Sequence, residues 1–514
     1  MAHNRTLNRR QFLKAASAAA AAPYAVPRTS GRKPNLLFLW TDEQRSDTMA
    51  VYGNTKIKTP CLNKLAGESV VFRNAYVSQP VCTPSRATVM TGLWPHQSSC
   101  LANNIPLAEH LRCFPEILND PDYCTAYMGK WHLGDEIFSQ HGFQEWVSIE
   151  DGYRGHYSHG RDRSHKSSYW QFLSELGYRP DQEGFYSRKF AAHLPIEHCK
   201  PKFLETRAIE FMRRHQQEPF ILYVNFLEPH MPYFGPLNDL HDLNALDLPP
   251  NFDDPLEEDE PLRYRLLRQN YIDKGFDGHD LHSESGWRRL LANYYGLVSH
   301  VDRSVGAILA ELERLGLNEN TIVVYTSDHG DMMGSHKLLA KTVMYEESVK
   351  VPWLMRVPQM NRRQTILPGR YSHIDLVPTL LELMGNRNAD LPGRSLAPVI
   401  NTVCRGLTNC GESRVQREVF IQWNRSEGEL SASLSNVTEK EVARVHDAPI
   451  RTVITQDGWK LCRCDRDKHQ LFDLNSDPYE THNLYDTGDH AKRIRDLTKR
   501  IHDWQTAVKD TATA

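Results

Sequence analysis

The apolar run Pro34-Asn35-Leu36-Leu37-Phe38-Leu39-Trp40-Thr41 is the stretch that does most to define the fold. It has the length of a strand, and its continuous hydrophobicity is typical of a parallel strand buried on both faces of a sheet. Strands that alternate with helices predict an α/β fold with a large, mostly parallel central sheet flanked by helices. The further strand-like runs are Phe220–Phe226 and Thr321–Thr326, and the long helical patterns are Phe203–His215 and Trp287–Leu315.

Polar and charged side chains follow each of these predicted strands. In open α/β sheets, ligands bind in the crevice beyond the carboxyl ends of the strands, where the ends of neighbouring parallel strands meet. The sequence therefore predicts one functional site, to which the residues after three strands contribute: Asp42, Glu43, Glu228, His230, Asp328 and His329.

Composition excludes several classes of protein. The chain has 514 residues, 61 Lys and Arg, and 64 Asp and Glu, which gives a formal net charge of −3. No excess of positive charge is available to neutralise a nucleic-acid backbone. No apolar stretch reaches the roughly 18 residues of a membrane-spanning helix. Ten cysteines in 514 residues are too few for a disulfide scaffold. A globular enzyme is the class that remains.

The N-terminus has the layout of an export signal. Paired Arg9-Arg10, followed by Gln-Phe-Leu-Lys and the alanine-rich run from Ala15 to Ala22, resembles a twin-arginine signal. The alternative is an amphipathic first helix with two chance arginines. A twin-arginine signal over residues 1–30 predicts a periplasmic or secreted protein. Such proteins are typically exported after folding, which leaves time for cofactor loading or residue modification in the cytoplasm.

The rest of the chain is predicted to divide into a large α/β domain, residues 31–400, and a smaller C-terminal α+β subdomain, residues 401–514. The segment from Pro236 to Glu284 is acidic and contains several prolines, so we interpret it as a long surface insertion. Cys404 and Cys410 could pair in an oxidising compartment or stay free. The subdomain is predicted from strand-like pieces and a final helical pattern: Val419–Trp423, Arg451–Thr455, Trp459–Arg463, Gln470–Leu474 and Ala491–Val508.

The segment Cys82-Thr83-Pro84-Ser85-Arg86, which continues to Thr91-Gly92, has the features of a nucleophile beside an anion site. Pro84 suits the first turn of a helix. Cys82 then lies just before the helix N-terminus, where the helix dipole favours an anion, and Arg86 can bind an oxyanion nearby. From these residues alone, a buried structural cysteine in front of a capped helix is an equal alternative.

This segment resembles the signature Cys-x-Pro-Ser-Arg of the sulfatases, within the alkaline-phosphatase superfamily. Six further segments extend the resemblance over nearly all of the mature chain. The resemblance implies that Cys82 is oxidised to Cα-formylglycine by a maturase, and that the hydrated aldehyde is the nucleophile.

The resemblance also implies a divalent metal at the strand ends, bound by Asp42, Glu43, Asp328 and His329. Oxygen ligands of this kind suit Ca²⁺, with Mg²⁺ as the alternative. Family members usually carry two adjacent aspartates at the first position, whereas the second residue here is Glu43. Its role as a direct ligand is therefore less secure than that of Asp42. His329 stands where many sulfatases have asparagine and others have histidine.

Three further blocks resemble the family's sulfate-binding segments. Gly129-Lys130-Trp131-His132-Leu133-Gly134 implies that Lys130 and His132 contact the sulfate and the formylglycine hydroxyl. The block from Glu228 to Tyr233 implies that His230 contacts the ester oxygen. The block from Ala340 to Glu346 implies a second sulfate-binding lysine, Lys341, for which Lys337 is the nearby rival. His96, Asn103 and Asn104 are further candidates for the edge of the pocket.

The predicted function is hydrolysis of a sulfate ester to an alcohol and sulfate, with Cys82, Arg86, Lys130, His132, His230 and Lys341 as the catalytic set. The substrate would be a sulfated small molecule or a sulfated carbohydrate. Two alternatives remain at this stage. One is a phosphonate monoester or phosphodiester hydrolase on the same scaffold. The other is a catalytically inactive carbohydrate-binding relative, against which the intact catalytic set argues.

Overall fold

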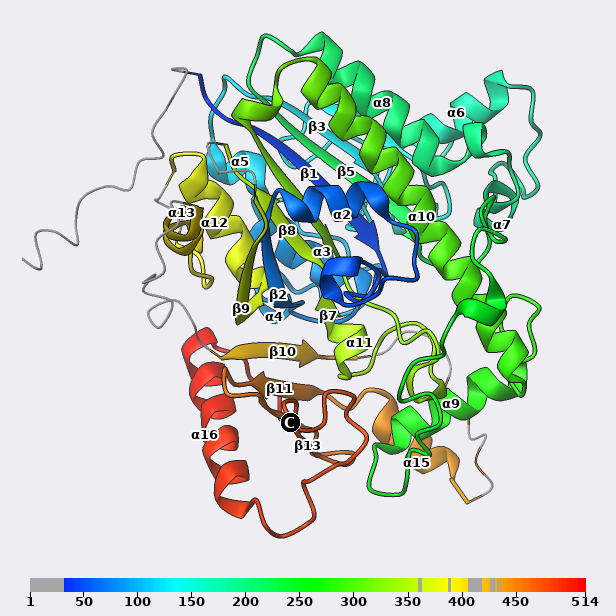
Figure 1. Ribbon diagram of the computed structural model, residues 1–514, viewed down its shortest axis with the longest axis vertical. Coiled ribbons are helices and arrows are strands. Elements are labelled where there is room, and N and C mark those ends of the chain that lie inside the picture. The colour runs from blue at the N-terminus through cyan, green and yellow to red at the C-terminus, as the bar shows by residue number, and fades with distance from the viewer. Residues whose placement is uncertain are drawn as a thin grey trace, which may run out of the picture.

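The computed structural model describes residues 32–358, 363–386, 390–404, 418–425, 430–431, 434 and 436–514. Its strands form two sheets, one of nine strands and one of four (Figure 1). The large sheet and its helices make up the upper body in Figure 1, and the small sheet lies below it. The predicted signal segment, residues 1–30, lies outside the described residues, as does Cys410 of the candidate disulfide.

The large sheet has the order β4-β3-β5-β1-β6-β8-β2-β7, and β9 pairs with β2. Pairing directions show that β7 and β8 run against the other strands, so the sheet is mixed but mostly parallel, as predicted. Its strands are β1 (Asn35–Asp42), β2 (Val70–Tyr76), β3 (Cys124–Gly129), β4 (Glu145–Ser148), β5 (Phe220–Pro229), β6 (Thr321–Ser327), β7 (Lys350–Val351), β8 (Trp353–Arg356) and β9 (Thr365–Ser372).

Strand β1 is buried along its whole length between β5 and β6. Alternate side chains enter two separate cores. Leu36, Phe38 and Trp40 belong to the core on one face, and Leu37 and Leu39 belong to the core on the other. Side chains of a strand point alternately to opposite faces, so a strand covered on both faces must be apolar at every position. This explains the continuous apolar run in the sequence.

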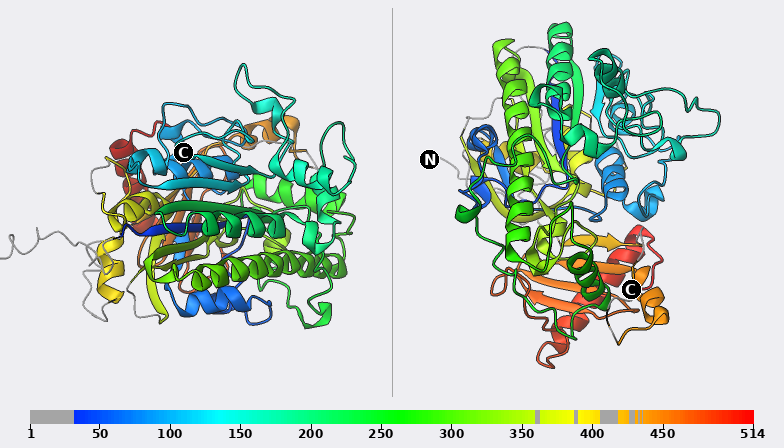
Figure 2. Two further views of the ribbon diagram at one scale, coloured as in Figure 1. Left: turned by 90° about the horizontal axis from the view of Figure 1, so that it is seen from above. Right: turned by 90° about the vertical axis from the view of Figure 1, so that its right-hand side faces the viewer.

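Helices cover both faces of the large sheet (Figure 2). The core that contains Leu37 includes buried residues of α2 (Pro60–Gly67), α8 (Lys200–Arg214) and α10 (Glu284–Arg314). The core that contains Phe38 includes residues of α3 (Cys82–Thr91), α5 (Phe114–Leu118), α12 (Leu376–Leu383) and α13 (Ala397–Cys404). None of the helices in the described ranges is long and apolar enough to cross a membrane.

The small sheet is antiparallel in the order β10-β11-β12-β13. Leu497 and Ile501 of α16 (Ala491–Val508) pack against Val453, Leu461 and Leu471 of the sheet. The strands agree with the predicted pieces to within one residue at each end. They are β10 (Val419–Trp423), β11 (Ile450–Ile454), β12 (Trp459–Arg463) and β13 (Gln470–Asp473).

The acidic segment from Pro236 to Glu284 is only partly a surface insertion. It contains α9 (Leu262–Lys274), which contacts α15 (Glu439–His446). Tyr264 of α9 is fully buried, and its hydroxyl accepts a hydrogen bond from the backbone N–H of Met344 at 2.9 Å. The segment is thus a structural support for the chain around Met344, which the sequence pattern did not indicate.

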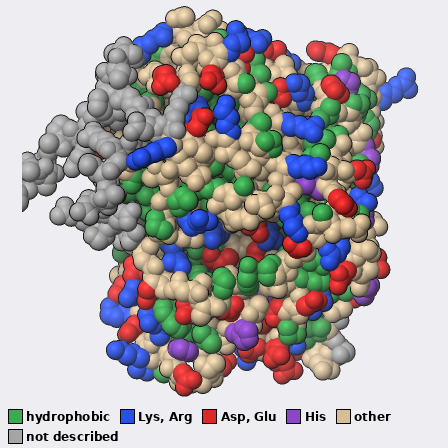
Figure 3. All heavy atoms as spheres, in the orientation of Figure 1, with side chains coloured by type: hydrophobic (Ala, Val, Ile, Leu, Met, Phe, Trp, Pro, Cys, Tyr) green, Lys and Arg blue, Asp and Glu red, His purple; other side chains and the backbone are tan. Residues whose placement is uncertain are grey.

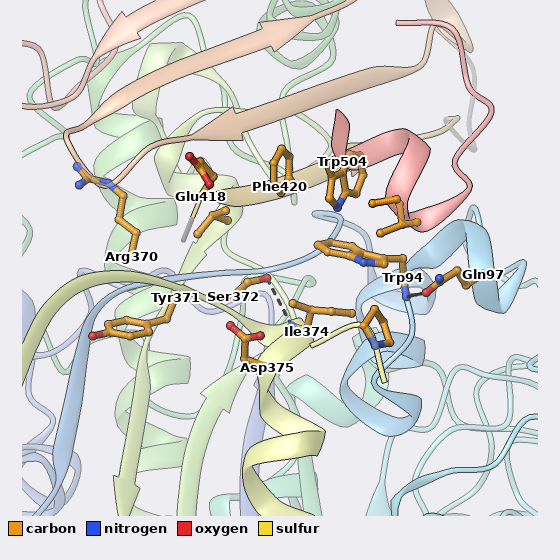
Figure 4. A pocket seen from close by; sticks show the side chains of 14 residues that line it. Trp94, Gln97, Arg370, Tyr371, Ser372, Ile374, Asp375, Glu418, Phe420 and Trp504 are labelled. Atoms are coloured by element: carbon orange, nitrogen blue, oxygen red, sulfur yellow. Dashed lines mark hydrogen bonds between the residues drawn. The ribbon is translucent and has the colours of Figure 1, made fainter. Parts of the chain in front are cut away.

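A pocket of about 290 Å³ lies at the junction of the two sheets (Figure 4). Aromatic side chains gather on one side of it, with Trp94 against Trp504 and Phe420 stacked on Trp504. Arg370 and Asp375 lie on the other side. His96 belongs to this junction too, because its ring bonds Gln422 and the carbonyl of Val508. On the face drawn in Figure 3, acidic and basic side chains are interspersed, as expected for a net charge of −3.

Candidate active site

The ten predicted site residues converge at the carboxyl ends of β1, β3, β5 and β6. Each is at most 9% exposed although nine of them are charged or ionisable polar groups. Charged groups are this deeply buried only when they are paired or bind an ion. The members are Asp42, Glu43, Cys82, Arg86, Lys130, His132, His230, Asp328, His329 and Lys341.

Cys82 is the first residue of α3, one position later in the helix than the sequence suggested. Its Sγ lies 3.2 Å from His329 Nε2, 3.7 Å from Asp42 Oδ1 and 3.9 Å from Lys130 Nζ. Burial and Asp42 act to raise the pKa of the Cys82 thiol, but Lys130, Lys341 and His329 outweigh them and lower it. An anionic atom is therefore favoured at this position.

Arg86, one turn further along α3, holds two carboxylates together. Its Nε donates to Asp328 Oδ2 at 2.8 Å, and its Nη2 donates to Asp42 Oδ2 at 3.0 Å. Its Nη1 donates to the carbonyl of Lys130 and to Asn225 Oδ1. Lys130 Nζ also donates to Asp42 Oδ2, at 2.5 Å. Arg86 is fully buried, and these contacts direct it at the acids and the backbone, so its geometry is that of a residue that orders the site.

The donor atoms at the centre of the site fit a hard divalent cation. Single ligand atoms of Asp42, Asp328, His329 and Cys82 lie within 4.8 Å of one another. His329 Nδ1 donates to the carbonyl oxygen of Gly330 at 2.9 Å, which turns Nε2 toward Asp42 and Asp328 at 3.7 and 3.6 Å. Glu43 Oε1 is buried without a hydrogen-bond partner. Glu43 groups within the same limit with Asp42 and His230, and not with Asp328 and His329. Its unpaired carboxylate oxygen is one that a bound Ca²⁺ or Mg²⁺ would satisfy.

Glu43 lies between Asp42 and the side chains of Lys341 and His230. Lys341 Nζ donates to Glu43 Oε2 at 3.0 Å, and His230 Nε2 lies 3.5 Å from the same oxygen. Burial raises the pKa of Glu43 to about 8, against the lowering effect of Lys341. His230 Nδ1 lies 2.7 Å from the carbonyl oxygen of Met231, which orients the ring. Lys341 and His230 therefore approach the site from the same side.

The loop that carries Lys341 is held by a residue that the sequence analysis missed. Asp331 Oδ1 accepts hydrogen bonds from the backbone N–H groups of Met333 at 2.7 Å and Ala340 at 3.0 Å. Asp331 is fully buried. Its position three residues after Asp328 was the one feature of the sequence that could have indicated a role at the site. Lys337, the rival of Lys341, instead pairs with Asp253 at 3.0 Å.

His132 occupies a strained turn after β3. Its backbone has φ 59°, and its N–H, like that of Trp131, donates to Glu136. The turn begins at Gly129, where a Cβ atom would lie 1.9 Å from the carbonyl oxygen of Asn225, so only glycine fits. Burial and Lys130 hold the pKa of His132 well below its usual value, which keeps the ring neutral.

The rim of the site is made by Asn104, Tyr153 and Arg188. His132 Nε2 lies 3.0 Å from Asn104 Oδ1, and the Tyr153 ring packs on the His132 ring with centroids 4.5 Å apart. Arg188 Nη1 lies 3.5 Å from His230 Nδ1. Asn104 was a secondary candidate, whereas Tyr153 and Arg188 come from a segment without any recognisable motif.

The buried site holds equal numbers of acids and cations, and a divalent ion would give it a net positive charge. Such a site suits an anionic ester, so the class of protein that it indicates is a hydrolase of anionic esters. The chain belongs to the sulfatase family, because the family model described as Sulfatase matches residues 34–386. The twin-arginine translocation (TAT) pathway signal model matches residues 6–23, so the protein carries an export signal, as predicted.

Similar proteins agree with this assignment. The chain is 29% identical to an uncharacterized sulfatase, YidJ, of Escherichia coli over 92% of this chain and 86% of that protein. It is 25% identical to an N-acetylglucosamine-6-O-sulfatase of Bacteroides thetaiotaomicron, and the alignment covers 93% of this chain and 87% of that protein. Among solved structures, the chain is similar to a phosphonate monoester hydrolase, SpPMH, from Silicibacter pomeroyi, with a TM-score of 0.76 and 22% sequence identity. The alignment covers 93% of this chain and 96% of that protein, and at this level of identity the similarity shows the fold alone.

The predicted family, α/β fold and enzyme class, a sulfuric ester hydrolase, are thereby confirmed. Sulfatases generally use a divalent metal and a formylglycine, and the clustered ligand atoms of Asp42, Asp328 and His329 are compatible with such a metal.

Proposed function

We propose that this exported sulfatase cleaves its substrate at the cluster around Cys82, and that a maturase converts Cys82 to formylglycine before export. The observation that carries the proposal is the surroundings of Cys82 Sγ, which lies within 4 Å of His329, Asp42 and Lys130 at the start of α3. Sγ marks the place of the formylglycine oxygen. As its hydrate, formylglycine supplies an oxygen nucleophile and a second hydroxyl through which sulfate is released.

The sulfate group would be held by Lys130, Lys341 and the N-terminus of α3. With Glu43 ionised, as a bound cation would require, Asp42, Glu43 and Asp328 bring three negative charges, and Arg86, Lys130 and Lys341 bring three positive charges. A divalent cation makes this balance positive by two, which favours an anionic ester and the charge that develops on its oxygens. We assign Arg86 the task of keeping Asp42 and Asp328 in place, since its donors are directed at them.

Asp42, Asp328, His329 and Glu43 would bind the metal, with Glu43 contributing its unpaired Oε1. Ca²⁺ is the proposed ion because three of the four ligands are carboxylates. When bound, it supplies positive charge next to position 82, which favours ionisation of a hydroxyl there.

Proton transfer is assigned to three residues. Lys341 Nζ and His230 Nε2 converge on Glu43 Oε2, and we place the departing alcohol oxygen on this side, where they stabilise or protonate it. His132 is kept neutral by burial and by Lys130, so it can accept the proton of the second hydroxyl. The relative named N-acetylglucosamine-6-O-sulfatase supports a sulfated carbohydrate as the substrate class.

The test is turnover by protein produced with and without a formylglycine-generating maturase. Matured protein should hydrolyse sulfate esters, and the peptide that contains Cys82 should lose about 18 Da, the change from thiol to aldehyde. Full activity of unmodified protein would disprove the role of formylglycine. Phosphonate monoesters should be assayed in parallel. A higher kcat/KM on them than on sulfate esters would favour the alternative hydrolase, which the fold of SpPMH permits.

A further inference from the structure

Arg188 lies on the solvent side of the site, next to the residue assigned to the departing oxygen. It is the first residue of α7 (Arg188–Ala192), and its Nη1 lies 3.5 Å from His230 Nδ1. The side chain of Arg188 is 27% exposed, whereas that of His230 is 9% exposed. Arg188 is thus within reach of the part of a substrate that projects beyond the sulfate.

The guanidinium group is held in a fixed orientation. Its Nε donates to Glu150 Oε2 at 2.6 Å, and its Nη2 donates to the Tyr153 hydroxyl at 2.7 Å. Tyr153 in turn packs on His132. Among the described residues, the contact to His230 at 3.5 Å is the one recorded for Nη1, so its N–H groups remain available to a ligand.

Glu150, the acid that holds Arg188, is shared by two cations, since Lys200 Nζ also donates to it. Glu228 and Asp42 are further acids whose charges act on Arg188. The capacity of Arg188 to bind an anion therefore depends on the N–H groups of Nη1, which are directed away from Glu150.

The segment that leads to α7 runs between β4 and α8, carries α6 (Ser168–Glu175), and projects from the side of the large sheet (Figure 2). Its first part is basic, since residues 154–166 contain four Lys and Arg, three His and one acid. Over residues 149–199 the segment contains seven Lys and Arg and seven acids, so it has no net charge as a whole. Recognition of an anion here therefore depends on the placement of Arg188 itself.

We infer that Arg188 forms a second anion subsite, which selects sulfate esters whose alcohol part bears another anionic group, a carboxylate or a second sulfate. A guanidinium group presents paired N–H donors that match both anions, and Arg188 is already oriented for such a contact. An alcohol part with a cationic group would be repelled. The inference rests on the proposed function and names the substrate class of the same site.

The test compares substrates that share one leaving alcohol. A sulfated hexuronic acid and its methyl ester differ in one negative charge, and a sugar disulfate and its monosulfate form a second pair. In Arg188→Ala, kcat/KM on the acid and the disulfate should fall by about 10-fold or more, mainly through KM. On the methyl ester and the monosulfate it should stay within about twofold. Loss with one pair only would identify which anion the subsite accepts.

Lys189→Ala is the matched control, because Lys189 is the next residue, exposed, and of the same charge. It should leave all four rates unchanged. Arg188→Lys should recover part of the lost selectivity, since it retains the charge without the paired donors. Equal losses on charged and neutral substrates, or no loss on either, would overturn the subsite. Failure of the proposed function would look different, because matured wild-type protein would then hydrolyse none of the sulfate esters.

Discussion

The catalytic cluster and the rim around Arg188 are both built from ion pairs, but they differ in burial and in origin. The cluster residues are at most 9% exposed and come from strand ends, the start of α3 and, for Lys341, the loop held by Asp331. Arg188 is 27% exposed at its side chain and comes from a connecting segment. Groups fixed by a sheet can be placed precisely for chemistry, whereas connecting segments can vary without disturbing the core. We therefore expect that the chemical step depends on the residues around Cys82, and that the choice of substrate depends on the residues around Arg188.

Replacement of the nucleophile should have the largest effect. Cys82→Ala should lower kcat by on the order of 10⁴-fold or more, because alanine cannot be converted to formylglycine and no nucleophile can then form at this position. The melting temperature should change little. Cys100→Ala is the matched control: Cys100 is also a fully buried free thiol, but it lies in the apolar core. An active Cys82→Ala variant would show that the reaction does not take place at the cluster around Cys82.

Removal of a metal ligand should come next. Asp328→Asn should lose bound metal, measured by elemental analysis, and lower kcat by on the order of 10²–10³-fold, the scale of a lost electrostatic stabiliser. Glu43→Asp restores the usual family residue and should retain metal and rate. If Glu43→Ala also kept both, Glu43 would not be a ligand.

The leaving-group side should show substrate-dependent effects. His230→Ala should lower kcat/KM on a sugar sulfate by on the order of 10²-fold, because an alkoxide needs a proton as it departs. On an activated aryl sulfate the loss should be much smaller, since a nitrophenolate hardly needs one. Arg86→Ala should affect both substrates alike, because Arg86 orders Asp42 and Asp328. Equal losses for His230→Ala would mean that His230 positions the sulfate only.

The smallest effect on rate is expected outside both regions. Glu480 accepts hydrogen bonds from the backbone N–H of Glu346 at 2.6 Å and pairs with the fully buried Lys460 at 2.8 Å. Glu480→Gln should reduce the free energy of unfolding by about 1–3 kcal/mol, read as a lower melting temperature, because it weakens a buried charged contact. The change in kcat should stay within about threefold. A loss of rate as large as that of His230→Ala would show that the small sheet takes part in catalysis.

The sequence alone determined the fold class, and its resemblance to a family named the residues that we propose as the catalytic set. The run from Pro34 to Thr41 is apolar at successive positions because both faces of β1 are covered. The residues of the Cys82 segment lie within one helix, so their spacing predicts their relative placement. Parallel strands bring their carboxyl ends to one edge, which is why Asp42 and Asp328 could be paired before any coordinates were known.

Some side chains reach the site from loops and connecting segments that have no periodic pattern or motif. Only the tertiary structure decided which of these side chains face the site. It placed Lys341 at Glu43 and Lys337 at Asp253, although both lysines lie in one loop. It brought Arg188 to His230 across 42 positions of the chain. Contacts of this kind depend on how distant segments pack and on the path of irregular loops, and no local periodicity records either of them.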